Sequence, residues 1–113
     1  MMVVFVSGPY RGDVSGNIER AKQVAIRLWK LGYAVVCPHL NTSHFDGICP
    51  DETWLKGDLE IMGRCDAVYM MSGWEKSEGA IAERKSAINQ GKILIYELSG
   101  ETGLLRTPGK PEN

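Results

Sequence analysis

Apolar and polar positions along the chain predict a regular succession of strands and helices. Four short runs are almost uninterrupted in apolar residues, as is typical of strands covered on both faces. These runs are Val3–Val6, Tyr33–Cys37, Asp66–Met71 and Ile93–Leu98. Three helices are predicted between them: Gly16–Leu31, where apolar residues recur every three or four positions, Asp51 to about Arg64, and a helix that opens at Ser77.

This alternation predicts an α/β fold of three layers, with a mainly parallel sheet of four to five strands between helices. Right-handed crossovers from a central first strand give the strand order 2-1-3-4, which is Rossmann-like or flavodoxin-like. Residues 1–98 then form a single domain. Residues 39–50 are predicted to be a polar loop, and residues 99–113, rich in Gly, Pro and charge, an irregular C-terminal tail.

Composition and charge narrow the class of protein. The 113 residues carry a formal net charge of −1, which gives no electrostatic case for binding nucleic acid or a membrane surface. No apolar run is long enough to span a bilayer, and the N-terminus reads as a strand and not as a signal peptide. The three cysteines lack a CxxC spacing. Reduced thiols in the cytoplasm are therefore expected.

Two carboxylates are the main candidates for chemistry. Asp58 falls inside the apolar stripe of its predicted helix, where a charge must be paired, hydrogen-bonded or neutralised. Glu83 lies beside the small residues Gly79, Ala80 and Ala87, which leave space for a ligand near the carboxyl edge of the sheet. The alternatives are that Asp58 is structural, capping a loop or pairing with an arginine, and that Glu83 is a solvated surface residue. If both face one pocket, they can divide the roles of nucleophile and general acid/base.

The segment SGPYRGD after the first strand resembles a phosphate-binding turn. Gly8 and Gly12 permit close backbone approach, and Arg11 can add charge-assisted hydrogen bonds to an anion. Ser77 can cap its own helix and still offer its hydroxyl to the same anion. The segment is neither GxGxxG nor a Walker loop, and most turns of this composition are only turns.

Further side chains are candidates for the wall of a pocket. Tyr10 can supply a ring or a hydroxyl, and His39 is placed to line the pocket after the second strand. A metal site at His39 and His44 matches no standard zinc spacing, so no metal is predicted. Trp54 and Trp74 are expected in the core or at an interface, not as stacking platforms for a base.

Three residues fit the predicted domain poorly. Arg84 is predicted to project toward the face of Ala80 and Ile88, which should meet the sheet or a partner. Ile26 and Trp29 lie off the main apolar stripe of the first helix. Together they suggest an interface between subunits.

The chain carries three motifs in order: SGPYRG, then DLEIM followed by CDAVYM, then SEGAIAE. Together they resemble the nucleoside 2-deoxyribosyltransferase superfamily. The resemblance runs from Val3 to about Tyr96 and is nearest to the branch of 2′-deoxynucleoside 5′-phosphate N-hydrolases. It implies a small-molecule nucleotide or nucleoside as substrate, no metal or organic cofactor, and a homodimer or higher homo-oligomer.

The resemblance also implies roles for individual residues. Glu83 matches the nucleophile that attacks the anomeric carbon, and Asp58 the carboxylate that assists it. The substrate-binding positions fall on Ser7, Gly8, Tyr10, Arg11, Gly12, His39, Ser77 and Gly79. Ser77, where transferases of free nucleosides carry Asp, favours a 5′-monophosphate together with Arg11. The implied activity is hydrolysis of its N-glycosidic bond, with transfer between bases and non-catalytic nucleotide binding as alternatives.

Overall fold

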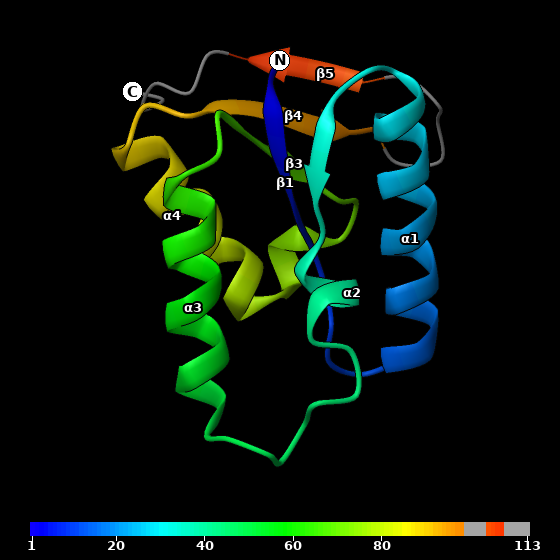
Figure 1. Cartoon of the computed structure of the whole chain (residues 1–113), viewed down its shortest axis with the longest axis vertical. Coiled ribbons are helices and arrows are strands. Elements are labelled where there is room, and N and C mark those ends of the chain that lie inside the picture. The colour runs from blue at the N-terminus through cyan, green and yellow to red at the C-terminus, as the bar shows by residue number, and fades with distance from the viewer. Residues whose placement is uncertain (99–103, 108–113) are drawn as a thin grey trace.

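The computed structural model describes residues 1–98 and 104–107, and its elements alternate along the chain as predicted (Figure 1). The strands are β1 (Val3–Ser7), β2 (Ala34–Val36), β3 (Ala67–Met70), β4 (Ile93–Glu97) and β5 (Leu104–Thr107). The helices are α1 (Val14–Lys30), α2 (Pro38–Asn41), α3 (Asp51–Gly63), the 3₁₀ helix η1 (Trp74–Lys76) and α4 (Glu78–Asn89). None of the described helices is both long and apolar enough to cross a bilayer.

The five strands form one sheet in the order β2-β1-β3-β4-β5. The first four are parallel, so the predicted order 2-1-3-4 is confirmed. β5 pairs antiparallel with β4, and the predicted irregular tail is therefore wrong for residues 104–107. Four residues between Gly103 and Pro108 carry too short an apolar pattern to predict a strand. The strand forms here because the edge of β4 supplies its hydrogen-bonding partner. The rest of the predicted tail lies outside the described residues.

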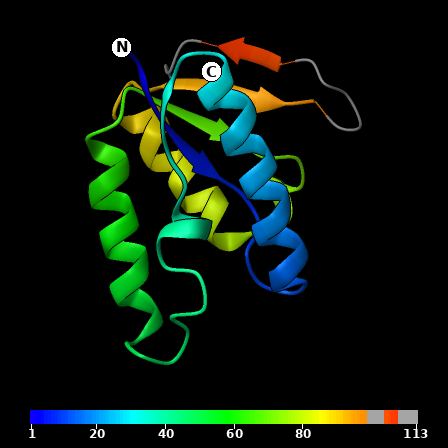
Figure 2. The same cartoon turned by 45° about the vertical axis from the view of Figure 1, so that its right-hand side comes forward.

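Helix α1 covers one face of the sheet, and α3 and α4 cover the other (Figure 1 and Figure 2). An apolar core lies on each face. Successive side chains of a strand point to opposite faces. In β1, Val4 and Val6 pack in the α1 core while Phe5 packs on the other side. In β3, Tyr69 and Met70 divide in the same way. The first and third apolar runs thus correspond to strands buried on both faces, whereas the residues of β2 are only partly buried.

The segment between β2 and α3 differs from its prediction as an irregular loop. Residues 38–41 form the single turn of helix α2, with Pro38 at a first-turn position where its missing N–H costs nothing. Asp51, predicted to cap α3, is instead the first residue of the helix, and Pro50 holds the cap position without a side-chain hydrogen bond. An acidic residue in the first turn still complements the helix dipole.

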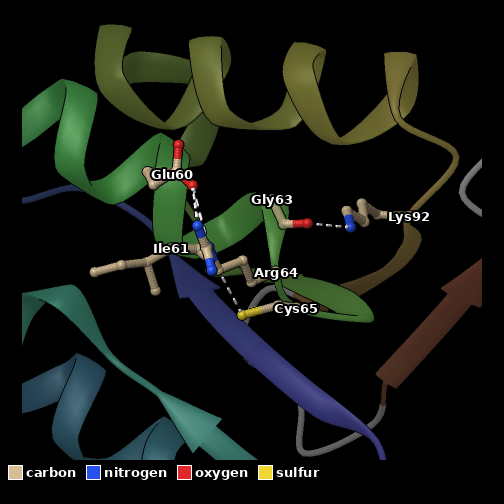
Figure 3. A network of polar contacts seen from close by, with 6 residues as sticks. All are labelled: Glu60, Ile61, Gly63, Arg64, Cys65 and Lys92. Carbon is tan, nitrogen blue, oxygen red and sulfur yellow. Dashed lines mark hydrogen bonds and ion pairs between the residues drawn. The ribbon is translucent and has the colours of Figure 1, made fainter.

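The C-terminal end of α3 is fixed against the connection between α4 and β4 (Figure 3). The Nζ of Lys92 donates a hydrogen bond to the Gly63 carbonyl at 2.8 Å, and Cys65 Sγ contacts the Ile61 carbonyl at 3.4 Å. Arg64 pairs with Glu60 on the exposed side of the helix at 2.8 Å. Helix-terminal carbonyls without intrahelical partners favour such cationic donors. The Lys92 contact thus joins the end of α3 to the connection between α4 and β4, whereas the other two contacts lie within the end of α3 itself.

Arg84 packs within the chain. Its guanidinium lies 4.9 Å from the ring centre of Trp74, and its Nε donates a hydrogen bond to the Tyr96 hydroxyl at 2.8 Å. Stacking on an aromatic ring and a phenolic partner together satisfy a cation on a face directed toward the sheet. The exposed Trp29 on α1 has no role in this cluster. The homo-oligomer stays a prediction.

Candidate active site

A cavity of about 650 Å³ opens at the carboxyl ends of β1 and β3. In the order β2-β1-β3-β4 this is the point where the chain reverses its direction of winding, and open α/β sheets bind their ligands there. The volume lies within the range of small-molecule sites. Its wall comes from the loop after β1, from α2 and the segment after it, from α3, and from the start of α4 with the preceding turn.

Glu83 lies at the inner end of the cavity. It is partly buried, and Ser7, which is fully buried at the end of β1, donates a hydrogen bond from Oγ to Glu83 Oε1 at 2.5 Å. Burial raises the pKa of Glu83 to about 7, the Ser7 hydroxyl opposes this shift, and the negative charge of Asp58 adds to it. Near neutral pH the carboxyl group therefore exchanges readily between its protonated and ionised forms.

Asp58 reaches the same cavity from α3. It is partly buried, and burial raises its pKa to about 6. The aspartate that interrupts the apolar stripe of α3 therefore faces the cavity. Two carboxyl groups from neighbouring helices thus share one cavity, and both have a pKa displaced toward neutrality. Such paired displacement is characteristic of sites that exchange protons with a substrate.

Buried side chains hold the backbone of the loop between β1 and α1. The Nε2 of His39 lies 2.8 Å from the Pro9 carbonyl, and because a carbonyl only accepts, this nitrogen carries the proton. Burial lowers the pKa of His39, so the ring is neutral at pH 7. The Nδ2 of the buried Asn17 donates to the carbonyls of Tyr10 and Arg11 at 3.0 and 3.1 Å. The loop thus presents a defined wall to the cavity.

Two side-chain contacts cross the mouth of the cavity. Arg11 pairs with Asp51 at 2.5 Å, and the Tyr10 hydroxyl donates to Asp46 at 2.7 Å. Arg11 and Asp51 are mostly exposed, with 78% and 64% of their side-chain surface open to solvent. The loop after β1 is therefore joined through its side chains to the segment that leads into α3.

Ser77 caps α4, as predicted. Its Oγ accepts a hydrogen bond from the Ala80 amide at 3.2 Å, and both residues line the cavity. An accepting hydroxyl keeps its own proton free to donate. The positive end of the α4 dipole also faces this part of the wall, which favours an anion or an oxygen acceptor from a ligand.

The predicted binding residues divide between the wall and its support. Gly8, Tyr10, Arg11, His39, Ser77 and Gly79 line the cavity together with Asp58 and Glu83. Ser7 and Gly12 are not among the described residues that do so. Ser7 supports Glu83, whereas Gly12 is exposed and has a φ of +91° in the turn before α1. Gly8 is required by packing, because a Cβ there would lie 2.7 Å from the Cβ of Met71.

Sequence reasoning missed several residues of the site. Trp54, expected in the core or at an interface, lines the cavity, and so do Asp46 and Asp51. Asn17 looks like an ordinary polar residue of a helix, but it is 3% exposed and holds the neighbouring loop. The turn-rich segment before α1 was a signal for Asn17, since an amide one turn into a helix can reach back to such a loop.

Among the described residues, no three His, Cys, Asp or Glu side chains are grouped as they would be around a metal ion. His44, the other histidine of the predicted loop, is exposed and does not line the cavity.

Solved structures with this architecture define the class of fold. A 2-deoxyribosyltransferase from Bacillus psychrosaccharolyticus superposes with a TM-score of 0.62 at 20% sequence identity, covering 83% of this chain and 70% of that one. A 2-deoxyribosyltransferase from Leishmania mexicana gives 0.64 at 16% identity, covering 85% of this chain and 63% of that one. The protein thus has the flavodoxin-like fold of the deoxyribosyltransferases, while spanning less than two thirds of the Leishmania enzyme.

Sequence comparison assigns the family. Residues 2–96 match the model of the Domain of unknown function DUF4406, and the chain belongs to this family. No curated protein matches it. The fold that the resemblance implied is confirmed by the two solved structures, whereas the chemistry of that superfamily and its hydrolase branch stay predictions.

Proposed function

We infer that the protein cleaves the N-glycosidic bond of a nucleoside or 2′-deoxynucleoside 5′-monophosphate, with Glu83 as the nucleophile. The observation that carries this proposal is the pair of carboxyl groups, Asp58 and Glu83, on one cavity wall with both pKa values raised by burial. Glycosidic bonds are commonly broken between two such carboxyl groups. The fold shared with deoxyribosyltransferases is consistent with chemistry at the anomeric carbon of a nucleoside.

In the proposed first step, ionised Glu83 bonds to C1′ while the C1′–N bond breaks. The base leaves with the bonding electron pair and takes a proton from Asp58. In the second step water attacks C1′, Asp58 accepts a proton from it, and the bond to Glu83 breaks. Two displacements retain the configuration at C1′. The Ser7 hydroxyl favours the ionised form of Glu83 between turnovers.

The mouth of the cavity is the proposed site of the 5′ end of the substrate. Arg11 offers a guanidinium, Ser77 a hydroxyl and α4 the positive end of its dipole. Binding energy from a group remote from the reacting bond can lower the barrier at that bond. The segment near Trp54 and Leu55 offers apolar surface for a ring.

The test is incubation with a panel of nucleosides and their 5′-monophosphates, with released base measured by chromatography. Base release from at least one compound, abolished in Glu83→Gln, is the expected result. Intact substrates after prolonged incubation, together with tight binding of a nucleotide, would replace the proposal with a non-catalytic nucleotide-binding module.

Transfer of the sugar between bases is the second candidate, favoured by the two deoxyribosyltransferases that share the fold. It uses the same first step, after which a second base takes the place of water. Adding a different free base to the reaction separates the two candidates. A new nucleoside indicates transfer, whereas free sugar or sugar phosphate indicates hydrolysis.

A further inference from the structure

The ion pair at the mouth occupies the arginine that is proposed to bind the phosphate. Arg11 Nη2 lies 2.5 Å from Asp51 Oδ2, a distance at which the carboxylate takes the position that a phosphate oxygen would need. The neighbouring contact between Tyr10 and Asp46 keeps the same two segments together. A phosphate can therefore engage Arg11 fully only after the bond to Asp51 is given up.

The charges around Arg11 are predominantly negative. The hydrogen bond and the charge of Asp51 raise the pKa of the Arg11 guanidinium, and the carboxylates of Asp46 and Glu78 raise it further. All three acidic residues line the cavity, and Lys76 is the other cation among the described lining residues. A phosphate dianion that reaches Arg11 thus meets three carboxylates, which a 5′-hydroxyl group tolerates far better.

We propose that Asp51 is a specificity-determining residue that competes with the 5′-phosphate of the substrate for Arg11. The competition weakens binding of a phosphate and leaves binding of a 5′-hydroxyl unchanged. The chain thereby accepts nucleosides and their monophosphates more evenly than an unpaired arginine would allow. This inference rests on the proposed function, because it assigns the mouth of the cavity to the 5′ end of the sugar.

A pair of probes without a base tests the competition directly. The affinities of 2-deoxyribose 5-phosphate and of 2-deoxyribose are measured by calorimetry for the wild-type protein and for Asp51→Asn. We expect the variant to bind the phosphate roughly twofold to fivefold more tightly, the range of an exposed ion pair. Binding of 2-deoxyribose should not change. Circular dichroism checks that α3, which begins at Asp51, is intact.

Two controls separate competition from general repulsion. Asp46→Asn removes the same charge from the same segment but leaves the Arg11–Asp51 pair in place. It should improve phosphate binding by less than half as much as Asp51→Asn does. In an Arg11→Gln background, Asp51→Asn should have no larger effect than Asp46→Asn, because the competed guanidinium is gone.

Equal effects of Asp46→Asn and Asp51→Asn would overturn the proposal in favour of overall charge. Failure of Asp51→Asn to bind the sugar phosphate more tightly than the wild-type protein, including no detectable binding by either, would also overturn it. The outcome is separable from that of the proposed function, since these probes contain no glycosidic bond to a base. Base release with unchanged phosphate affinity in Asp51→Asn would leave the enzyme assignment intact and remove only the role of Asp51.

Discussion

The ionisable groups at the two ends of the cavity lie in opposite environments. At the inner end, Asp58 and Glu83 are partly buried, and burial raises the pKa of both. At the mouth, Arg11 and Asp51 form an ion pair that remains mostly in water. Ionising a buried carboxyl group costs free energy, whereas an exposed ion pair contributes little to stability. The inner end is therefore suited to chemistry and the mouth to selection among ligands.

Replacing the proposed nucleophile should have the largest effect. Glu83→Gln keeps the size of the side chain and an oxygen that accepts from Ser7, but it cannot attack C1′. We expect base release to fall by a factor on the order of 10³ or more. Glu78→Gln is the matched control, with the same change in the same helix at the exposed rim, and should lose less than about tenfold. Equal losses in the two variants would contradict the division between the ends.

Asp58→Asn should have the next largest effect, a loss on the order of 10²-fold in kcat/KM. The pH profile of kcat/KM gives the sharper readout. The active form of the wild-type protein has Glu83 ionised and Asp58 protonated, and its population is greatest between their pKa values of about 7 and about 6. A narrow bell with its maximum between these values follows, and its two limbs belong to the coupled pair.

In the variant the alkaline limb should disappear. A single acid limb governed by Glu83 alone should remain, with an apparent pKa below 7, because the charge of Asp58 no longer raises the pKa of Glu83. Glu60→Gln, on the exposed face of the same helix, should leave both limbs in place. An unchanged profile in Asp58→Asn would exclude Asp58 as the proton donor.

Much of the fold and part of the candidate site could be predicted from the sequence, because burial imposes regular patterns of apolar residues. The four apolar runs predicted the strands, and an aspartate inside the apolar stripe of α3 drew attention to Asp58. Local rules also placed Ser77 at the start of α4, where its side chain caps the helix. These features depend on neighbours within a few residues of each other.

The features that the sequence did not yield depend on pairs far apart in the chain. Ser7 and Glu83 are 76 residues apart, and Arg11 and Asp51 are 40 apart. Taken alone, an arginine such as Arg11 or an aspartate such as Asp51 is typical of a solvated surface. The short strand β5 likewise exists through its pairing with β4, since its four residues have little pattern of their own. Such pairings follow from the tertiary fold and not from local propensity.

The inner end should also limit stability at alkaline pH. The pKa of Glu83 is about 7 in the folded protein against 4.5 as its ordinary value, so the folded state binds this proton more tightly. Its contribution to stability is complete below about pH 4.5 and is lost as the pH rises toward 7. Glu83→Gln should therefore raise the free energy of unfolding by up to about 3 kcal/mol at pH 8.

Denaturant titrations at pH 5 and pH 8 measure this effect. At pH 5 the wild-type carboxyl is mostly protonated and the variant should gain little. Glu78→Gln again serves as the control, since its carboxylate is exposed. A gain of equal size at both pH values would mean that the substitution acts through packing and not through the ionisation of Glu83.

The mouth should show the smallest effect on stability. Arg11→Gln removes one partner of an ion pair whose side chains are 78% and 64% exposed, so each partner is already well solvated. We expect Tm to change by less than about 5 °C at any pH between 5 and 8. Thermal unfolding at low and high salt measures this change in Tm. High salt should make the change smaller, because salt screens exposed charges. A larger, salt-resistant loss would mean that Arg11 holds the loop between β1 and α1 in place, a role otherwise filled by His39 and Asn17. The mouth would then be part of the rigid framework, and Arg11 would not be free to exchange Asp51 for a ligand.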